Sequence, residues 1–342
     1  KQMLEVLNRH FNLKLNSTAA EKLENLKEKL PLVGLILEYR ENFKIKSTYI
    51  EPILSLIGKD GRLRTTFNQT GTATGRLSSS EPNLQNIPQQ SKWAIRLRSA
   101  FVAEAGFKLA SFDYSQLELR ILAAVSGDEK MQNAFKQGQD IHQLTAAQVF
   151  NVPLERVTGD MRRLGKTLNF GVVYGMGADA FSRSSGLKKE EARRFITEYF
   201  ADFPKIKIWQ EEILAQARTL GYVATKTGRR RWLFNIQDFN PRVRAEAERI
   251  AVNMPIQGLG ADIIKLAMIK VVEFLRRENL MPDKARLLLS IHDELLFEIA
   301  DDILKETAAE IKKIMEEIYN LNLPLIVSYA SGRGWNELNL HT

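Results

Sequence analysis

LASFDYSQLELR (residues 109–120) closes an apolar, strand-like run with an acidic residue, Asp113, and Glu118 follows five positions later. A second stretch, RLLLSIHDELLFEI (residues 286–299), predicts a strand, a turn that holds Asp293, and another strand. An ionised carboxylate left unpaired among apolar strands is costly, so each aspartate needs a cation or access to solvent. Oxygen ligands suit hard cations, and two strand-end aspartates that meet would hold two metal ions ~3.5–4 Å apart. The simpler alternative is that each aspartate caps a turn.

Composition restricts the class of protein. The 342 residues include no Cys and four widely spaced His, which argues against a disulfide framework and against a Cys/His zinc site. No apolar run is long enough for a membrane span, and the chain starts without an initiator Met or a signal peptide, as a fragment or processed product would. The net charge is 49 − 41 = +8, with a pI near 9.4. This surplus fits a polyanionic partner, although a Lys- and Glu-rich soluble surface is an equal alternative.

The order of helical and strand-like segments predicts an α+β fold with locally paired strands. The expected elements are helices over 1–57, strands and loops over 62–88, helices over most of 124–220, a hairpin over 221–234, a helix interrupted at Pro255 over 241–278, the strand–turn–strand over 286–299, a helix over 301–319 and a strand over 325–329. Thr18 and Glu21 are spaced as a capping box at the start of one helix.

A stripe of cations and aromatic rings follows one predicted helix. Arg162, Lys166, Phe170 and Tyr174 occupy every fourth position, so they form a slowly winding row ~18 Å long. Two cations at one end and two rings at the other suit a ligand with phosphates at one pole and a base at the other. The alternative is an ordinary packed helix whose cations extend to solvent.

A second polar stripe lies in ERIAVNMPIQGLGADIIK (248–265), where Arg249, Asn253 and Gln257 are again four residues apart. The minor groove of a duplex presents mainly hydrogen-bond acceptors. Donors from this stripe and from Arg76 would therefore test base-pair geometry without reading the sequence. A buried polar network that locks the helix is the alternative.

Five motifs, in this order, resemble those of family A DNA polymerases, the bacterial DNA polymerase I group, over roughly residues 30–340. They are TATGRLSSSEPNLQNIP (72–88), DYSQLELR (113–120), RRLGKTLNFGVVYG (162–175), NMPIQG (253–258) and IHDE (291–294). The resemblance implies a right-hand fold with an antiparallel β-sheet palm, helical fingers and a partial helical thumb, as in a C-terminal polymerase domain with a truncated thumb. The implied subdomains are a partial thumb (1–57), the first part of the palm (58–123), the fingers (124–240) and the second part of the palm (241–342).

The resemblance also implies a role for each candidate site residue. Asp113 and Asp293 match the two metal-binding carboxylates, and Glu118 matches the residue that blocks a ribose 2′-hydroxyl. Arg162 and Lys166 match catalytic residues that grip the incoming triphosphate, with Lys166 as proton donor to the leaving group. The remaining matches are Gln116, Phe170, Tyr174 and His292 around the nucleotide; Arg120, as a partner of the acidic cluster, and Glu294 as supporting residues; and Arg76, Arg249, Asn253, Gln257, Lys46, Ser47, Thr48 and Tyr49 along primer–template DNA.

The implied activity is DNA-templated DNA synthesis in replication or repair, with two Mg²⁺ ions, or Mn²⁺ in their place, and no exonuclease module in this chain. The expected partners are primer–template DNA and deoxynucleoside triphosphates, with no membrane. We expect a monomer, with the missing part of the thumb on another segment or chain. We also expect a cytoplasmic, nucleoid-associated location for a bacterial or phage protein, with organelle targeting left open by the N-terminus. Two alternatives remain: a single-subunit RNA polymerase, against which Glu118 argues, and a non-catalytic DNA-binding protein, against which the intact catalytic set argues.

Overall fold

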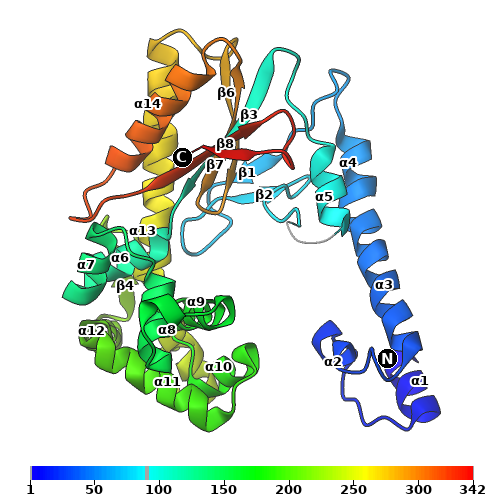
Figure 1. Ribbon diagram of the computed structural model, residues 1–342, viewed down its shortest axis with the longest axis vertical. Helices are drawn as coiled ribbons and strands as arrows, with labels where there is room; N and C mark the ends of the chain where they lie inside the picture. The colour runs from blue at the N-terminus through cyan, green and yellow to red at the C-terminus, as the bar shows by residue number, and fades with distance from the viewer. Residues whose placement is uncertain (1, 89–91, 342) are drawn as a thin grey trace. The chain divides into compact units, whose positions relative to one another are not determined.

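The computed structural model describes residues 2–88 and 92–341, which divide into two compact units. Unit 1 contains Lys1–Phe67 and Ser79–Ala94, and unit 2 contains Asn68–Ser78 and Ile95–Thr342. Figure 1 shows the chain coloured from its N-terminus to its C-terminus. The thumb, palm and fingers boundaries drawn from the sequence stay a prediction.

Unit 1 is mainly helical, as predicted for residues 1–57. Its elements are α1 (Gln2–Phe11), α2 (Ala20–Glu24), α3 (Pro31–Ile45), the π-helical turn η1 (Lys46–Ile50) and α4 (Glu51–Leu56). Leu7, Leu23 and Val33 form its small core. The predicted capping box is wrong, because the Thr18 hydroxyl instead accepts a hydrogen bond from Arg40 (3.0 Å) and α2 begins without a side-chain cap.

The centre of unit 2 is a five-stranded antiparallel sheet with the strand order β6-β7-β3-β8-β9. The strands are β3 (Phe107–Tyr114), β6 (Ala285–Ile291), β7 (Glu294–Ala300), β8 (Val327–Gly332) and β9 (Asn339–His341). Helix α14 (Leu304–Glu317) packs on the sheet, where the Tyr114 hydroxyl donates to the Met315 carbonyl (2.7 Å), and α13 (Pro241–Arg277) lies beside α14 (Figure 1). The α+β class and the predicted strand–turn–strand are confirmed.

The other helices of unit 2 gather at one end of the sheet (Figure 1). They are α6 (Leu117–Ser126), α7 (Glu129–Lys136), α8 (Ile141–Phe150), the 3₁₀ turn η2 (Leu154–Arg156), α9 (Gly159–Val173), α10 (Ala178–Ser185), α11 (Lys189–Asp202) and α12 (Pro204–Leu220). Asp140 caps α8, and Thr158 caps α9. Gly165 allows α8 and α9 to pack closely, because a Cβ there would collide with the carbonyl oxygen of His142.

Short strands and one further helix complete the fold. The predicted hairpin is present as β4 (Tyr222–Ala224) and β5 (Arg230–Trp232), and the loop-rich segment contains β1 (Thr66–Asn68) and β2 (Ser78–Ser80), followed by α5 (Lys92–Ser99). No helix in the described ranges 2–88 and 92–341 is long and apolar enough to cross a membrane.

Helix α13 continues through Pro255, so the predicted interruption is wrong. Proline removes one hydrogen bond from a helix interior. Here Met254, Pro255 and Ile256 are all buried, and their packing holds the helix together across that missing bond. Gly258 brings α13 against the hairpin, because a Cβ there would lie 2.6 Å from Thr225 Cγ2.

Candidate active site

Three carboxylates meet at one end of the central sheet. Asp113, near the end of β3, lies opposite Glu294, the first residue of β7. Asp293 lies in the turn that precedes β7, and its carbonyl accepts a hydrogen bond from the Tyr114 backbone N–H (3.1 Å). The turn is tight enough to place His292 in the left-handed region, at φ 52°. The structure therefore brings Asp113 and Asp293 together, as the prediction of a shared metal site requires.

The carboxylates of this cluster oppose one another's ionisation. Burial, followed by the charges of Glu294 and Asp293, raises the pKa of Asp113 to about 7. Because the Asp113 side chain is exposed to solvent, we attribute its raised pKa chiefly to repulsion from the charges of Glu294 and Asp293. Burial also raises the pKa of Glu294 and of Asp293. Ser111, which donates to Glu294 (2.5 Å), and the nearby Arg98 partly offset the effect on Glu294.

A hydrogen-bonded network links this cluster to the end of α9. Arg76 donates to Glu118 (2.7 Å) and lies 3.6 Å from Asp293. Glu118 is buried, at 5% exposure, and its second oxygen accepts from the Tyr174 hydroxyl (2.9 Å). Burial, followed by the charge of Glu118, raises the pKa of Tyr174 to about 12, so this hydroxyl keeps its proton and donates it to Glu118 in a hydrogen bond. The Tyr174 side chain also forms a hydrogen bond with the Gln257 side chain. Glu118 is thus held by Arg76 on one side and by Tyr174, at the end of α9, on the other.

The opposite end of α9 carries the two cations. Arg162 pairs with Asp140 (2.6 Å), the residue that caps α8. Lys166 is exposed, and its ammonium lies 6.0 Å from the centre of the Phe170 ring. The predicted stripe of cations followed by rings is therefore present along α9.

The loop that carries Arg76 is held by a contact across unit 2. Gly75 adopts φ +83°, and a Cβ on it would lie 2.5 Å from Arg229 Cζ. Arg229 donates from Nε and Nη2 to a single oxygen of Asp262 (3.1 and 2.6 Å), a side chain that is only 12% exposed. These two hydrogen bonds hold the Arg229 guanidinium against Gly75. Arg229 and Asp262 escaped the sequence analysis because no local spacing links residues 33 positions apart.

The α13 stripe is exposed at Arg249 and half-buried at Asn253 and Gln257. Arg249 is exposed, and its side-chain stem packs against Gly175 at the end of α9, where a Cβ would lie 3.2 Å from Arg249 Cγ. Among the described residues, Asn253 Oδ1 and Gln116 Oε1 are buried acceptors without a hydrogen-bond partner. Orphaned polar atoms are rare in folded proteins and suit a site that a ligand completes.

Two predicted placements need correction. Arg120 was expected beside the acidic cluster, but it donates to the carbonyls of Ser115 (2.9 Å) and Pro324 (2.7 Å) and stacks on Phe135, because its position on α6 is buried. Burial lowers its pKa to about 10.

Tyr49 was expected along DNA, but it is buried and donates to the Asn86 carbonyl (2.7 Å) inside unit 1. In the same stretch, Lys46 and Thr48 are exposed and Ser47 donates to the Phe43 carbonyl (2.8 Å).

A buried polar cluster between α8 and α9 also escaped the sequence analysis. Asn169 donates to Thr145 (3.0 Å) and lies 3.2 Å from His142 Nδ1. Burial lowers the pKa of His142 to about 4, so its ring is neutral at physiological pH. The available signal was the sequence Asp140-Ile-His142, a helix cap followed by a polar residue on the inner face.

The donor set of the cluster fits a hard divalent cation, because it consists of carboxylate oxygens whose negative charges Arg76 and Arg98 compensate only in part. Within the ranges 2–88 and 92–341, no group of three or more His, Asp or Glu side chains is arranged to hold a metal ion. Any ion at Asp113 and Asp293 would therefore need further oxygen ligands from substrate and water.

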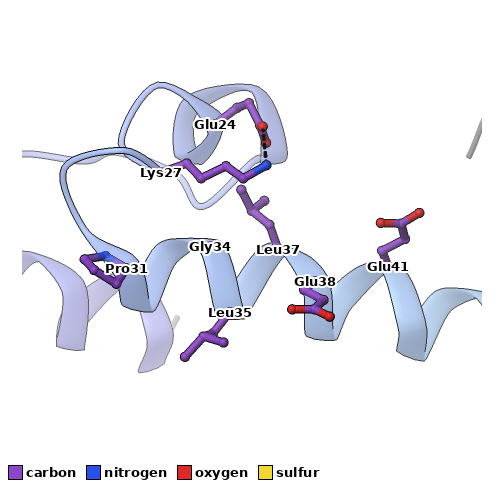
Figure 2. A pocket seen from close by; sticks show the side chains of 8 residues that line it. All are labelled: Glu24, Lys27, Pro31, Gly34, Leu35, Leu37, Glu38 and Glu41. Atoms are coloured by element: carbon purple, nitrogen blue, oxygen red, sulfur yellow. Dashed lines mark hydrogen bonds and ion pairs between the residues drawn. The ribbon is translucent and has the colours of Figure 1, made fainter. Parts of the chain in front are cut away.

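Unit 1 contains a separate hollow of about 670 Å³ between α2 and α3 (Figure 2). It is lined by Glu24, Lys27, Pro31, Gly34, Leu35, Leu37, Glu38 and Glu41. None of the predicted site residues is among them, and three glutamates against one lysine do not suit an anionic ligand.

Comparison with known proteins agrees with this geometry. The sequence model described as DNA polymerase family A matches residues 1–337. The chain is 50% identical over 323 residues to the thermostable DNA polymerase I of Thermus thermophilus and 46% identical over 320 residues to the DNA polymerase I of Deinococcus radiodurans. These matches cover 93% of this chain in both cases, but 38% and 33% of the two relatives.

A solved structure is also similar: the POL domain of Pol1 from M. smegmatis, in complex with DNA primer–template and dNTP, with a TM-score of 0.88 and 40% identity. The match covers 94% of this chain and 56% of that one.

Proposed function

The chain belongs to DNA polymerase family A, and from this premise we propose that it extends a primer 3′ end by template-directed DNA synthesis. The observation that carries the proposal is the continuous network from Tyr174 through Glu118 and Arg76 to Asp293. It joins the helix that would hold the nucleotide to the carboxylates that would do the chemistry. The primer–template and dNTP of the M. smegmatis complex support the same two substrates here.

Family membership implies a dependence on divalent metal ions, for which we propose Mg²⁺, with Mn²⁺ as a substitute. Asp113 and Asp293 would hold two such ions, whose chemistry when bound is activation of the primer hydroxyl and neutralisation of the leaving pyrophosphate. The raised pKa of Asp113 supports this assignment, because a cation relieves the repulsion that Glu294 and Asp293 exert on it.

Side chains of α9 would bind and orient the triphosphate. Arg162 and Lys166 supply two positive charges on one face, and Lys166 is the proposed proton donor to pyrophosphate. In the structure Arg162 is paired with Asp140, so it must leave that carboxylate to reach a phosphate. We propose that the pair holds Arg162 in place until the nucleotide arrives, and that Phe170 and Tyr174 then pack on the sugar and the nascent base pair.

Glu118 would inspect the sugar. A buried carboxylate held from two sides cannot swing aside without breaking its bonds to Arg76 and Tyr174. A ribose 2′-hydroxyl in its place would meet a fixed obstacle, which disfavours the single-subunit RNA polymerase alternative. Gln116 and His292 would complete the pocket around the nucleotide and primer end.

Arg249, Asn253 and Gln257 would contact the minor groove of the duplex, and Lys46, Ser47 and Thr48 its phosphates. We withdraw Tyr49 from this set because it is buried. The polymerase match leaves only residues 338–342 outside it, so we assign synthesis and no exonuclease activity to this chain. A monomeric state and a cytoplasmic location remain proposals from the sequence.

Primer extension tests the function. A radiolabelled primer on a DNA template should lengthen only with a divalent cation, and with dNTPs far better than with rNTPs. Preference for rNTPs would favour the RNA polymerase alternative. Tight binding of primer–template without extension would favour a non-catalytic DNA-binding protein.

A further inference from the structure

Two phenylalanine side chains project into solvent from the segment after the hairpin of unit 2. Phe234 is 92% exposed and Phe239 is 100% exposed, and Trp232 at the end of β5 is 57% exposed. Large rings exposed to this degree lose the favourable free energy that burial of their apolar surface would give. Two of them within six residues therefore call for a partner.

Their exposure is a property of an ordered segment. Leu233 and Ile236 are buried in the core formed by the hairpin, α12 and α13. Gln237 donates to the Arg218 carbonyl (2.7 Å), and Asn240 caps α13. The backbone is thus fixed on both sides of the two phenylalanines, and the fold holds their rings outward.

The hairpin and the segment that follows it are strongly basic. Residues 221–244 contain six Lys or Arg residues and one acidic residue, Asp238. Within the described part of the chain, Lys226, Arg230, Arg231 and Arg242 form no ion pair with an acidic side chain. Their charges are therefore available to an anionic partner.

Cations and rings also alternate in space on the hairpin. Tyr222 lies opposite Trp232 in the strand pairing, with their ring centres 5.1 Å apart. The Arg230 guanidinium lies 4.9 Å from the centre of the Tyr222 ring. Flat rings interleaved with uncompensated arginines are typical of surfaces that bind single-stranded nucleic acid, where bases stack and phosphates pair with cations.

We propose that the segment formed by Trp232, Phe234 and Phe239, with Arg230 beside it, binds the unpaired 5′ overhang of the template strand. The proposal rests on the proposed function. In a primer–template, unpaired bases occur only in the overhang, and paired bases hide the faces on which a ring stacks. The segment leads directly into α13, whose Arg249 follows Pro241 by eight residues, ~12 Å of helix. The overhang would thus adjoin the duplex contacts.

The test is affinity as a function of overhang length. Fluorescence anisotropy would give the Kd of the intact chain for primer–templates with a blunt end and with overhangs of increasing length. Affinity should rise with the overhang. The double variant Phe234→Leu/Phe239→Leu, which keeps apolar bulk but no ring, should lose this gain, about tenfold or more in Kd, while binding blunt duplex as the wild type does. Phe234→Trp/Phe239→Trp should keep it.

A matched control is Leu340→Ala, which removes another exposed apolar side chain (67% exposed) from unit 2 and should leave the gain unchanged. Two results would overturn the proposal: an overhang gain that survives in the double leucine variant, or a wild-type dimer in sedimentation that this variant abolishes, which would make the rings a contact between copies. Failure of the wild type to bind even blunt duplex would instead refute the proposed function.

Discussion

Replacing Gly75 with Ala should disturb the candidate active site, because the new Cβ would collide with Arg229. The energetic cost of this collision can be measured separately from the cost of the backbone conformation. The glycine has φ +83°, and a Cβ on it would lie 2.5 Å from Arg229 Cζ. A guanidinium at the end of a free side chain would simply move. This one donates two hydrogen bonds to Asp262, so moving it breaks an ion pair with a largely buried partner.

The expected cost has two parts. A left-handed backbone conformation costs Ala about 1–2 kcal/mol relative to Gly, and overpacking adds about 1–3 kcal/mol. We expect Gly75→Ala to lower the free energy of unfolding by about 2–5 kcal/mol in total. The neighbouring Arg76 should shift with it, so kcat/KM for primer extension should also fall.

A double-mutant cycle separates the two parts. Arg229→Ala removes the guanidinium, so in that background Gly75→Ala should cost only the backbone part, leaving a coupling energy of about 1–3 kcal/mol. Urea denaturation of the four proteins measures it. Gly106→Ala is the matched control, because Gly106 has φ +82° and a Cβ added there would meet no atom within 4 Å.

Two results would contradict this account: a cost of Gly75→Ala no greater than that of Gly106→Ala, or a cost of Gly75→Ala that Arg229→Ala leaves unchanged. Either result would mean that the glycine serves only its backbone conformation and that Arg229 does not hold the loop.

The carboxylates of the site give three further predictions. Asp113→Asn and Asp293→Asn should each nearly abolish primer extension while duplex binding, measured by anisotropy, persists; Asp283→Asn, an exposed turn residue, should change neither, and near-normal extension by either of the first two would remove them from the chemistry. Glu118→Ala should raise rNTP incorporation relative to dNTP in single-turnover assays, and an unchanged ratio would place the gate elsewhere. The pKa of Asp113, raised from 3.8 to about 7 by burial and then by Glu294 and Asp293, means that its contribution to stability is complete below its unfolded pKa and is lost as the pH rises through about 7. The thermal midpoint in EDTA should therefore fall between about pH 4 and about pH 7, and less so in Asp113→Asn; an equal fall in both proteins would contradict this.

Local sequence patterns predicted the individual helices and strands well, but they did not predict which of these elements contact one another. The apolar runs on either side of Asp293 were long and bounded by a turn, so two strands were the natural prediction. The four-residue repeat along α9 likewise fixed which side chains share its face. The approach of Asp113 to Asp293 depends on β3 pairing with β7 across about 180 residues, and no spacing in the sequence encodes that register.

The errors have a common physical origin, which is competition from partners distant in sequence. Thr18 had the spacing of a helix cap, but Arg40 takes its hydroxyl. The family resemblance placed Arg120 beside the acidic cluster, but the Pro324 carbonyl and the Phe135 ring surround it. Pro255 should break a helix, but burial on α13 outweighs the missing hydrogen bond.

One guanidinium, that of Arg76, serves both Glu118 and Asp293. Evolution cannot tune either carboxylate independently under this arrangement. A substitution at Glu118, the proposed sugar gate, would free Arg76 to move closer to Asp293, and would thereby change the affinity of that proposed metal ligand for a cation. Laboratory selection for broader substrate use should therefore yield enzymes with an altered metal requirement, and compensating changes should accumulate around Arg76.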